Sequence, residues 1–168
     1  MSNKIVYQVQ NKPNLKELER LFVAAFSQSP DSDKFTPETD QILKEWLDLK
    51  ELKKYLPYGT LIEARCQKQL VGAVFIAKQN PITWPDGRKA EGFILAVLPK
   101  FRNRGIGKRL IKMQEIEAKK FGAKKIVINT HVLLKANQKL FQRMGYKKIG
   151  ILKDYYDNGD AVFFSKDL

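Results

Sequence analysis

Apolar and polar residues are ordered along the chain in a way that predicts short strands separated by amphipathic helices. Residues 5–10 alternate as in a strand, and Asn14 is a suitable N-cap for the helix that follows. One face of that helix is apolar, at Leu15, Leu18, Leu21, Phe22 and Ala25. A second helix is predicted to begin at Thr36 and Pro37 and to end at Pro57, because proline suits the first turn of a helix and breaks its interior.

The remaining residues predict a hairpin, a central strand and two further helices. Residues 60–66 and 70–77 are apolar or alternating runs joined by a short polar turn, as in a hairpin. A turn-rich loop at 80–87 leads to a strand at 93–97 and then to a helix that ends near Gly122. A strand at 125–130, a helix at 135–144 and strands at 147–152 and 161–165 complete the series. The order β-α-α-β-β-β-α-β-α-β-β predicts an α+β fold with a mixed sheet.

Composition bounds the kind of protein that these elements build. With 168 residues, 43% hydrophobic and 29% charged, the chain suits one well-cored globular domain spanning residues 1–168. No run approaches the roughly 18 apolar residues of a membrane span, and residues 1–10 lack the apolar core of a signal peptide. We therefore expect a cytoplasmic protein with no membrane partner.

Residue usage also argues against metal and nucleic-acid chemistry. A single cysteine, Cys66, lies in a strand-like run and is interpreted as a core residue, and with only one histidine we expect no metal site. The net charge of +13 favours polyanionic partners or acidic substrates. The basic residues are nonetheless scattered, without a nucleic-acid-binding motif or a basic tail, so we interpret them as solvated faces and expect no nucleic-acid partner.

The most informative stretch is the loop between the central strand and the next helix. Its residues 102–107 read Arg-Asn-Arg-Gly-Ile-Gly, and two glycines so close together let successive backbone N–H groups point into one concavity at a helix N-terminus. Such a terminus favours phosphate. The basic residues around it are Lys100, Arg102, Arg104, Lys108 and Arg109. Leu110 stands where a Rossmann fingerprint needs its third glycine, and the first glycine of a Walker loop is missing, so neither nucleotide motif fits.

The loop does fit the pattern [RQ]-x-x-G-x-[GA], and with its preceding strand it resembles the pyrophosphate-binding signature of the GNAT superfamily of N-acetyltransferases. The resemblance extends over residues 61–168, and ANQKLFQRMGYKK is similar to the family's second motif helix. The closing residues 152–168 resemble its ribosomal-protein and peptide acetyltransferase branch. The resemblance implies the GNAT acyl-CoA N-acyltransferase fold, acetyl-CoA (coenzyme A) as cofactor and an amine of a protein, peptide or small molecule as acceptor. Dimers are common in the family, so a homodimer is one oligomeric state that it implies.

The same resemblance implies which residues hold the cofactor. Backbone N–H groups of the loop would bind the pyrophosphate, at Arg102, Asn103, Arg104, Gly105, Ile106, Gly107 and Lys108. The pantetheine would lie along Leu95, Ala96 and Val97, where the family's fourth and fifth strands part beside a bulge. The Val97 N–H would then face the thioester oxygen.

Candidate acid and base residues follow from the chemistry of acetyl transfer. An alkyl amine with a pKa near ~10 is mostly protonated at neutral pH, so a base is useful. Glu91 is the first candidate, because the resemblance places the catalytic glutamate of the family's histone-modifying branch at this position, six residues before Val97. The even spacing predicts that both side chains share one face of the strand. His131, just after the fifth strand, is an alternative base. Tyr155 or Tyr156 could supply an acid, with Tyr156 the preferred candidate, or solvent could do so.

The sequence departs from the family pattern in its second motif helix. Phe141 stands where many members carry a tyrosine that can donate a proton, and Leu134 stands where the usual asparagine is expected. Asn137, one turn later, is therefore the candidate contact to coenzyme A. Two other functions stay open on the same fold. One is a coenzyme A-binding module without catalysis, and the other is a basic RNA- or ribosome-associated protein.

Overall fold

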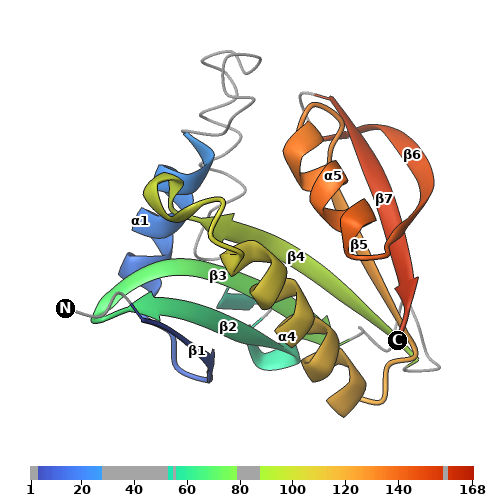
Figure 1. Ribbon diagram of the computed structural model, residues 1–168. Coiled ribbons are helices and arrows are strands. Elements are labelled where there is room, and N and C mark those ends of the chain that lie inside the picture. Colours follow the sequence, from blue (N-terminus) through green and yellow to red (C-terminus); the bar gives the residue numbers. More distant parts are fainter. Residues whose placement is uncertain (1–3, 28–52, 55, 79–87, 157–158) are drawn as a thin grey trace.

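The computed structural model describes residues 4–27, 53–54, 56–78, 88–156 and 159–168, and it contains a mixed sheet with helices on both faces (Figure 1). The strands are β1 (Ile5–Gln10), β2 (Gly59–Cys66), β3 (Gln69–Lys78), β4 (Lys89–Val97), β5 (Lys125–His131), β6 (Lys147–Tyr156) and β7 (Gly159–Asp167). The helices are α1 (Leu15–Phe26), α4 (Ile106–Lys120) and α5 (Lys135–Arg143), with short 3-10 turns η2 (Leu56–Tyr58) and η3 (Pro99–Phe101). This order confirms the predicted fold class. The second predicted helix, over residues 36–56, lies almost wholly outside the described residues.

The described residues form a sheet of seven strands in the order β1-β2-β3-β4-β5-β7-β6. Only β4 and β5 are parallel, and every other neighbouring pair is antiparallel. A parallel neighbour needs a crossover connection, which α4 supplies by leaving the end of β4 and returning the chain to the start of β5. The N-terminus of α4 therefore lies beside the carboxyl end of β4.

The helices divide between the two faces of the sheet. A Cβ placed on Gly92 of β4 would lie 2.6 Å from Nε2 of Gln114, so this face of β4 packs directly against α4. Thr130 of β5 points to the same side and contacts Asn137 of α5. On the opposite face, α1 packs against β3 and β4 through an apolar stripe that includes Leu18 and Phe22. We refer to these as the α4 face and the α1 face.

The predicted start of α1 is confirmed. Asn14 is the N-cap, and its Oδ1 accepts a hydrogen bond from the Glu17 N–H at 3.3 Å. This bond satisfies one of the N–H groups that the first turn of a helix leaves without a partner. Cys66 is a free, buried thiol within the core, as its strand-like surroundings predicted.

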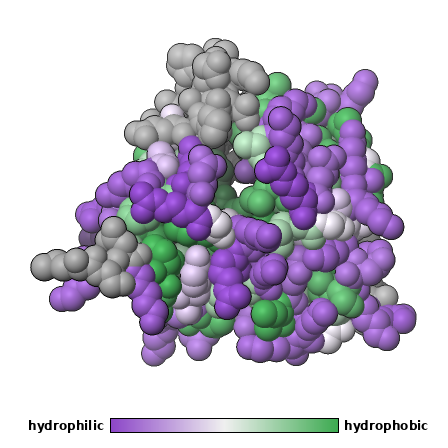
Figure 2. Space-filling model, viewed as in Figure 1, coloured by the Kyte–Doolittle hydropathy of each residue, from purple (hydrophilic) through white to green (hydrophobic). Residues whose placement is uncertain are grey.

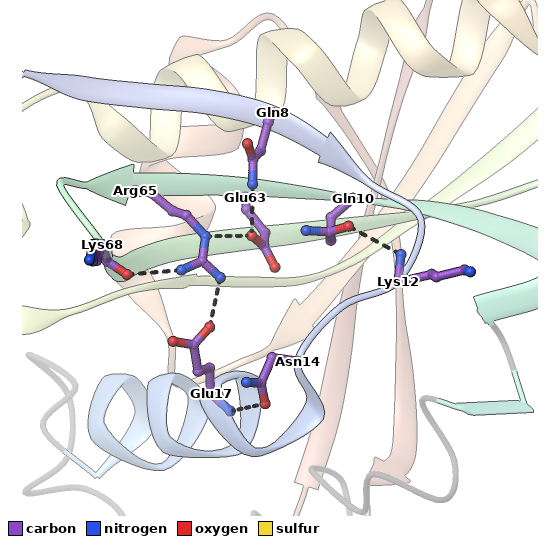
Figure 3. Close-up of polar contacts among 8 residues, drawn as sticks. All are labelled: Gln8, Gln10, Lys12, Asn14, Glu17, Glu63, Arg65 and Lys68. Atoms are coloured by element: carbon purple, nitrogen blue, oxygen red, sulfur yellow. Dashed lines mark hydrogen bonds and ion pairs between the residues drawn. The ribbon is translucent and has the colours of Figure 1, made fainter.

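A polar cluster joins α1 to the sheet on the α1 face (Figure 3). Glu63 of β2 is fully buried, and its Oε2 accepts a hydrogen bond from Nε of Arg65 at 2.8 Å. The Arg65 guanidinium also reaches Oε2 of Glu17 on α1 at 2.7 Å and the carbonyl of Lys68 at 3.0 Å. Gln8 of β1 makes a longer contact to Glu63, at 3.4 Å. Because burial removes the Glu63 carboxylate from water, the arginine is needed to compensate its charge.

We expect Arg65→Met to lower the free energy of unfolding by about 3 kcal/mol, because it leaves the buried Glu63 carboxylate without its cation. Urea denaturation followed by circular dichroism measures this loss. The control is the double variant Glu63→Gln/Arg65→Met, which removes the buried charge as well. A double variant as unstable as Arg65→Met would show that packing, and not the uncompensated charge, explains the loss.

Candidate functional site

The two central parallel strands pair over only part of their length. Lys89–Gly92 of β4 aligns with Lys125–Ile128 of β5, and the pairing ends there, although β4 continues to Val97 and β5 to His131. Beyond Gly92, β4 and β5 do not pair with each other. The strands part at the carboxyl end of β4, the edge at which α4 begins.

A β-bulge in β4 lies directly after this point. Phe93 pairs with Phe75 and Ala96 with Ala73, so that Ile94 and Leu95 together face Val74 of β3. Ile94 has a φ of 55°, in the left-handed region that a β-branched residue rarely adopts. The extra residue shifts the alternation of side chains by one position along the rest of β4.

The bulge contradicts the prediction that Glu91 and Val97 share one face. Val97 pairs with Gly72, whose position faces Ile106 and Leu110 of α4, so the Val97 side chain lies on the α4 face. Glu91 is adjacent to Gly92, which faces α4, and therefore lies on the α1 face. Even spacing predicts a shared face only in a strand without a bulge.

The backbone of Val97 is oriented by the ladder to β3. The Leu98 N–H donates to the Val71 carbonyl at 2.9 Å. Hydrogen-bonding groups alternate between the two sides of an antiparallel strand, so the N–H of Val97 points away from β3 and toward the side where β5 has parted from β4. The Val97 carbonyl accepts a hydrogen bond from Nε of Arg102 at 3.3 Å.

The loop before α4 presents a group of backbone donors. The N–H groups of residues 103–108 have no hydrogen-bond acceptor within the described part of the chain. The first helical N–H to be bonded is that of Arg109, which donates to the Gly105 carbonyl at 3.0 Å. The N–H of Arg102 is not part of this group, because it donates to Pro99 at 3.1 Å. A helix N-terminus with several available N–H groups is an anion-binding arrangement.

Two glycines shape this terminus in different ways. Gly105 is the N-cap of α4, with a φ of 77° that other residues adopt only under strain. A Cβ on Gly107 would lie 3.5 Å from Cδ2 of Leu140 on α5 and 3.9 Å from Cγ2 of Val97, which are ordinary contacts. The protein itself therefore does not require glycine at 107, and a side chain there would fill the space beside the available N–H groups.

Charged side chains around the loop have two roles. Arg102 turns inward, where its guanidinium donates to the Ala25 carbonyl at the end of α1 and to Val97, so it fixes the loop to the fold. Burial lowers the pKa of Arg102. The other basic residues near the loop are exposed, at Lys100, Arg104, Lys108 and Arg109. Figure 2 shows that hydrophilic side chains cover most of the face that includes α4.

Glu91 lies in the last paired stretch of β4, between Ala77 of β3 and Val127 of β5. Burial raises the pKa of its carboxyl, although more than a third of the residue is exposed to solvent. We expect the rise to be modest, because water that reaches the carboxylate screens the protein environment. Glu91 is thus an accessible carboxylate on the α1 face, near the point where the strands part.

Tyr156 and His131 lie together at the end of β5. Their rings stack with centroids 5.3 Å apart, and the Tyr156 hydroxyl donates to Oδ1 of Asn129 at 2.6 Å. Tyr156 is buried, and burial together with the neighbouring Tyr155 raises the pKa of its phenol well above the ordinary value. Nδ1 of His131 accepts a hydrogen bond from the Leu133 N–H at 3.1 Å, which places the proton of the neutral ring on Nε2. Asn129 and His131 point to the α1 face, since Thr130 between them points to α5.

The candidate residues of α5 lie on the α4 face. Nδ2 of Asn137 is 3.4 Å from Oγ1 of Thr130, a long hydrogen bond that directs the amide toward β5. Phe141 is buried in the core and packs against Tyr146 and Phe164, with ring centroids 6.0 and 5.7 Å away. The Phe141 ring is therefore a core element of α5.

Sequence reasoning missed two residues that the structure places at the site. Asn129 lies in the strand predicted at residues 125–130, and Leu140 lies in the helix predicted at residues 135–144. Nothing in the local sequence distinguishes them, because Asn129 is identified by its bond to Tyr156 and Leu140 by its approach to Gly107. Both contacts join residues that are far apart in the chain.

The described residues contain neither a metal-binding cluster nor a membrane-spanning helix. They include no group of three or more His, Cys, Asp or Glu side chains able to hold a metal ion. No helix among them combines the length and apolar character needed to cross a membrane.

Comparisons with known proteins agree with this arrangement. Several solved structures share the fold over almost the whole chain. The N-acetyltransferase PaiA from Thermoplasma acidophilum, solved with coenzyme A, superimposes with a TM-score of 0.78 at 16% identity, covering 97% of this chain and 99% of that one. A Bacillus subtilis acetyltransferase in complex with CoA gives 0.71 at 22% identity, covering 98% and 99%. A GNAT family acetyltransferase from Elizabethkingia anophelis, with acetyl-CoA bound, gives 0.69 at 20% identity, covering 99% and 100%.

Family membership rests on the sequence itself. A search of curated proteins finds no relative. At these levels of identity the structural neighbours show a shared fold and nothing more specific. The family model described as acetyltransferase (GNAT) family, however, matches residues 12–146, which is most of the chain. The chain therefore belongs to the GNAT acetyltransferase family.

Proposed function

We propose that the protein is an acetyl-CoA-dependent N-acetyltransferase that acts on a primary amine of a protein, peptide or small molecule. The observation that carries the proposal is the pairing of two features at one edge of the sheet. One is the set of available N–H groups at residues 103–108, and the other is the parting of β4 from β5 beside the bulge. The first suits a pyrophosphate, and the second leaves strand groups free to bond an extended chain that contains amides.

The residues present fit coenzyme A. The N–H groups from Asn103 to Lys108 would hold the pyrophosphate, and the space beside Gly107 admits close approach to the backbone. Leu95, Ala96 and Val97 would line the pantetheine, with Asn137 of α5 on the same side of the sheet. Arg102 supports this site indirectly, since it ties the loop to Val97 and Ala25.

Acetyl-CoA, when bound, supplies an activated thioester, and residues of this chain would orient the acceptor and move its proton. We assign Glu91 as the base that accepts the ammonium proton on its carboxylate, directly or through water. It is accessible and lies on the α1 face, opposite α4. The Val97 N–H, directed to where the strands part, would donate to the oxygen of the acetyl group. The acceptor then approaches from the α1 face while the cofactor is held from the α4 face.

The alternative residues are less suited to proton transfer. In the tautomer that the Leu133 N–H fixes, one nitrogen of His131 accepts a hydrogen bond and the other carries the proton, so neither offers a lone pair to an ammonium group. The Tyr156 hydroxyl already donates to Asn129, and its raised pKa makes it a weaker acid. We assign Tyr156 to holding the Asn129 amide on the acceptor side.

The direct test is binding followed by turnover. Acetyl-CoA at about 100 times its dissociation constant should stabilise the folded protein by roughly 2.7 kcal/mol, which differential scanning fluorimetry detects as a raised melting temperature. Acetyl transfer is then measured over a panel of peptide, polyamine and aminoglycoside amines. Binding without transfer to any amine would favour a coenzyme A-binding module without catalysis. An unchanged melting curve and no binding by calorimetry would reject the proposed function.

A further inference from the structure

Gln114 is a buried polar side chain on the packed side of α4, where Glu117 is also buried. It is 2% exposed, and its neighbours on the packed side of the helix are Leu110, Ile111 and Ala118, all fully or almost fully buried. A buried amide has a cost unless it is hydrogen-bonded, and an apolar residue of similar size would pack without that cost. The contacts of the Gln114 amide therefore have to offset the cost of burying it.

The Gln114 amide contacts both places where β4 leaves regular pairing. On one side it lies against Gly92, where a Cβ would be 2.6 Å from Nε2 and 2.8 Å from Cδ of Gln114, and 2.8 Å from Cγ2 of Ile128. Gly92 and Ile128 form the last pair between β4 and β5. On the other side, Nε2 donates to the Phe75 carbonyl of β3 at 2.8 Å. Along β4, the pair of Phe93 with Phe75 is the last in register before the bulge.

We propose that Gln114 is a positioning residue that holds β4 on its bulged, diverging course. This inference rests on the proposed function, because that course is the one along which the pantetheine arm would bind. Glycine at 92 leaves room for the amide beside the last β4–β5 pair, and the bond to Phe75 fixes β3 where the bulge begins. These contacts of Gln114 with Gly92 and Phe75 involve neither the available N–H groups of residues 103–108 nor the side chain of a candidate acid or base.

The two parts of coenzyme A provide the test. Adenosine 3′-phosphate 5′-diphosphate is coenzyme A without its pantetheine arm, so it probes the loop alone, whereas whole coenzyme A probes the loop and the strands. Isothermal titration calorimetry at 25 °C would compare wild type with Gln114→Met, which keeps the side-chain length and removes the donor. We expect the variant to bind coenzyme A about tenfold more weakly. The loss of one buried hydrogen bond lets β4 leave the course along which the pantetheine would bind, and the free energy of such a bond is comparable to about a tenfold change in affinity. Its affinity for the fragment should stay within twofold.

A matched control separates positioning from lost stability. Ala118→Gly alters a buried residue one turn further along α4 and lowers helix stability, and Ala118 takes no part in the contacts of the Gln114 amide with Gly92 and Phe75. It should lower the melting temperature and leave both dissociation constants unchanged. Gly92→Ala is the second variant, since its methyl group displaces the Gln114 amide, and it should reproduce the selective loss of coenzyme A affinity if Gln114→Met does not fold.

The outcomes are distinct. Equal losses for coenzyme A and the fragment, or unchanged affinity for coenzyme A in folded Gln114→Met and Gly92→Ala, would overturn the positioning role while leaving the proposed function intact. Wild-type protein that binds neither ligand would reject the proposed function, and this inference with it. If Gln114→Met or Gly92→Ala loses affinity for coenzyme A but not for the fragment, and Ala118→Gly does not, the result supports both the positioning role and the proposed function.

Discussion

Gly107→Val is expected to weaken coenzyme A binding on the order of 100-fold or more while leaving the protein folded. The branched side chain would occupy the space bounded by Val97 and Leu140, next to the available N–H groups. Keeping a pyrophosphate away from the loop removes at least two hydrogen bonds to a charged group, each worth about 1.5 kcal/mol or more. The first atom of the new side chain meets both neighbours at ordinary contact distances, so we expect only a small loss of stability. Calorimetry with coenzyme A measures the affinity.

The control for this variant is Gly150→Val. Gly150 lies in β6, in open space and without a positive φ, so it accepts the same substitution far from the loop. It should bind coenzyme A as wild type does. Wild-type affinity in folded Gly107→Val would show that the loop is not the phosphate site.

The sequence was sufficient to predict the fold because its signals are local and repeated. Asn14 marks the start of α1, and the apolar stripe of α1 matches its buried face. The match is poorer in α4, where Ile116 is exposed and the polar Gln114 and Glu117 are buried. The glycine loop was equally readable, because a helix N-terminus with two glycines needs only neighbouring residues to form. Such features depend on backbone propensity and short spacings, which a sequence displays directly.

The arrangement of the site was less predictable, because it depends on contacts between distant segments. The face of Glu91 was predicted wrongly, because the spacing from Glu91 to Val97 crosses the bulge at Ile94. The family resemblance implies a bulge in this strand, but the local sequence does not give its position. In the same way, the role of Arg102 is decided by the Ala25 carbonyl on α1, which lies 77 residues earlier. A strand's period can be read from sequence, but the point at which tertiary contacts interrupt that period cannot.

Placing Glu91 on the α1 face changes how its role is tested. If Glu91 and Val97 shared a face, replacing Glu91 would disturb both the cofactor and the acceptor. Since they lie on opposite faces, Glu91→Gln should leave coenzyme A affinity nearly unchanged and act on the amine alone. Binding and rate can therefore be separated in one variant.

We expect Glu91→Gln to lower kcat/KM by about 10²–10⁴ at pH 7, the range that a positioned general base contributes. Glutamine keeps the shape of the side chain and cannot accept the proton. The matched control is Glu19→Gln, which makes the same change of charge at an exposed position on α1 and should leave the rate unchanged.

The pH dependence is the decisive measurement for Glu91. In wild type the carboxylate form is active, so the rate should fall at low pH as the carboxyl becomes protonated, with a pKa above its ordinary 4.5 because burial disfavours the charged form. In Glu91→Gln this fall of the rate at low pH, which comes from the carboxyl, should disappear. The rate should instead rise about tenfold per pH unit up to the pKa of the amine, because only the neutral amine reacts without a base. The deficit therefore shrinks as pH rises. If the rate of Glu91→Gln is lower than that of wild type by the same factor at every pH, Glu91 binds the acceptor and is not the base. If the two rates are equal at every pH, another residue of the α1 face is the base.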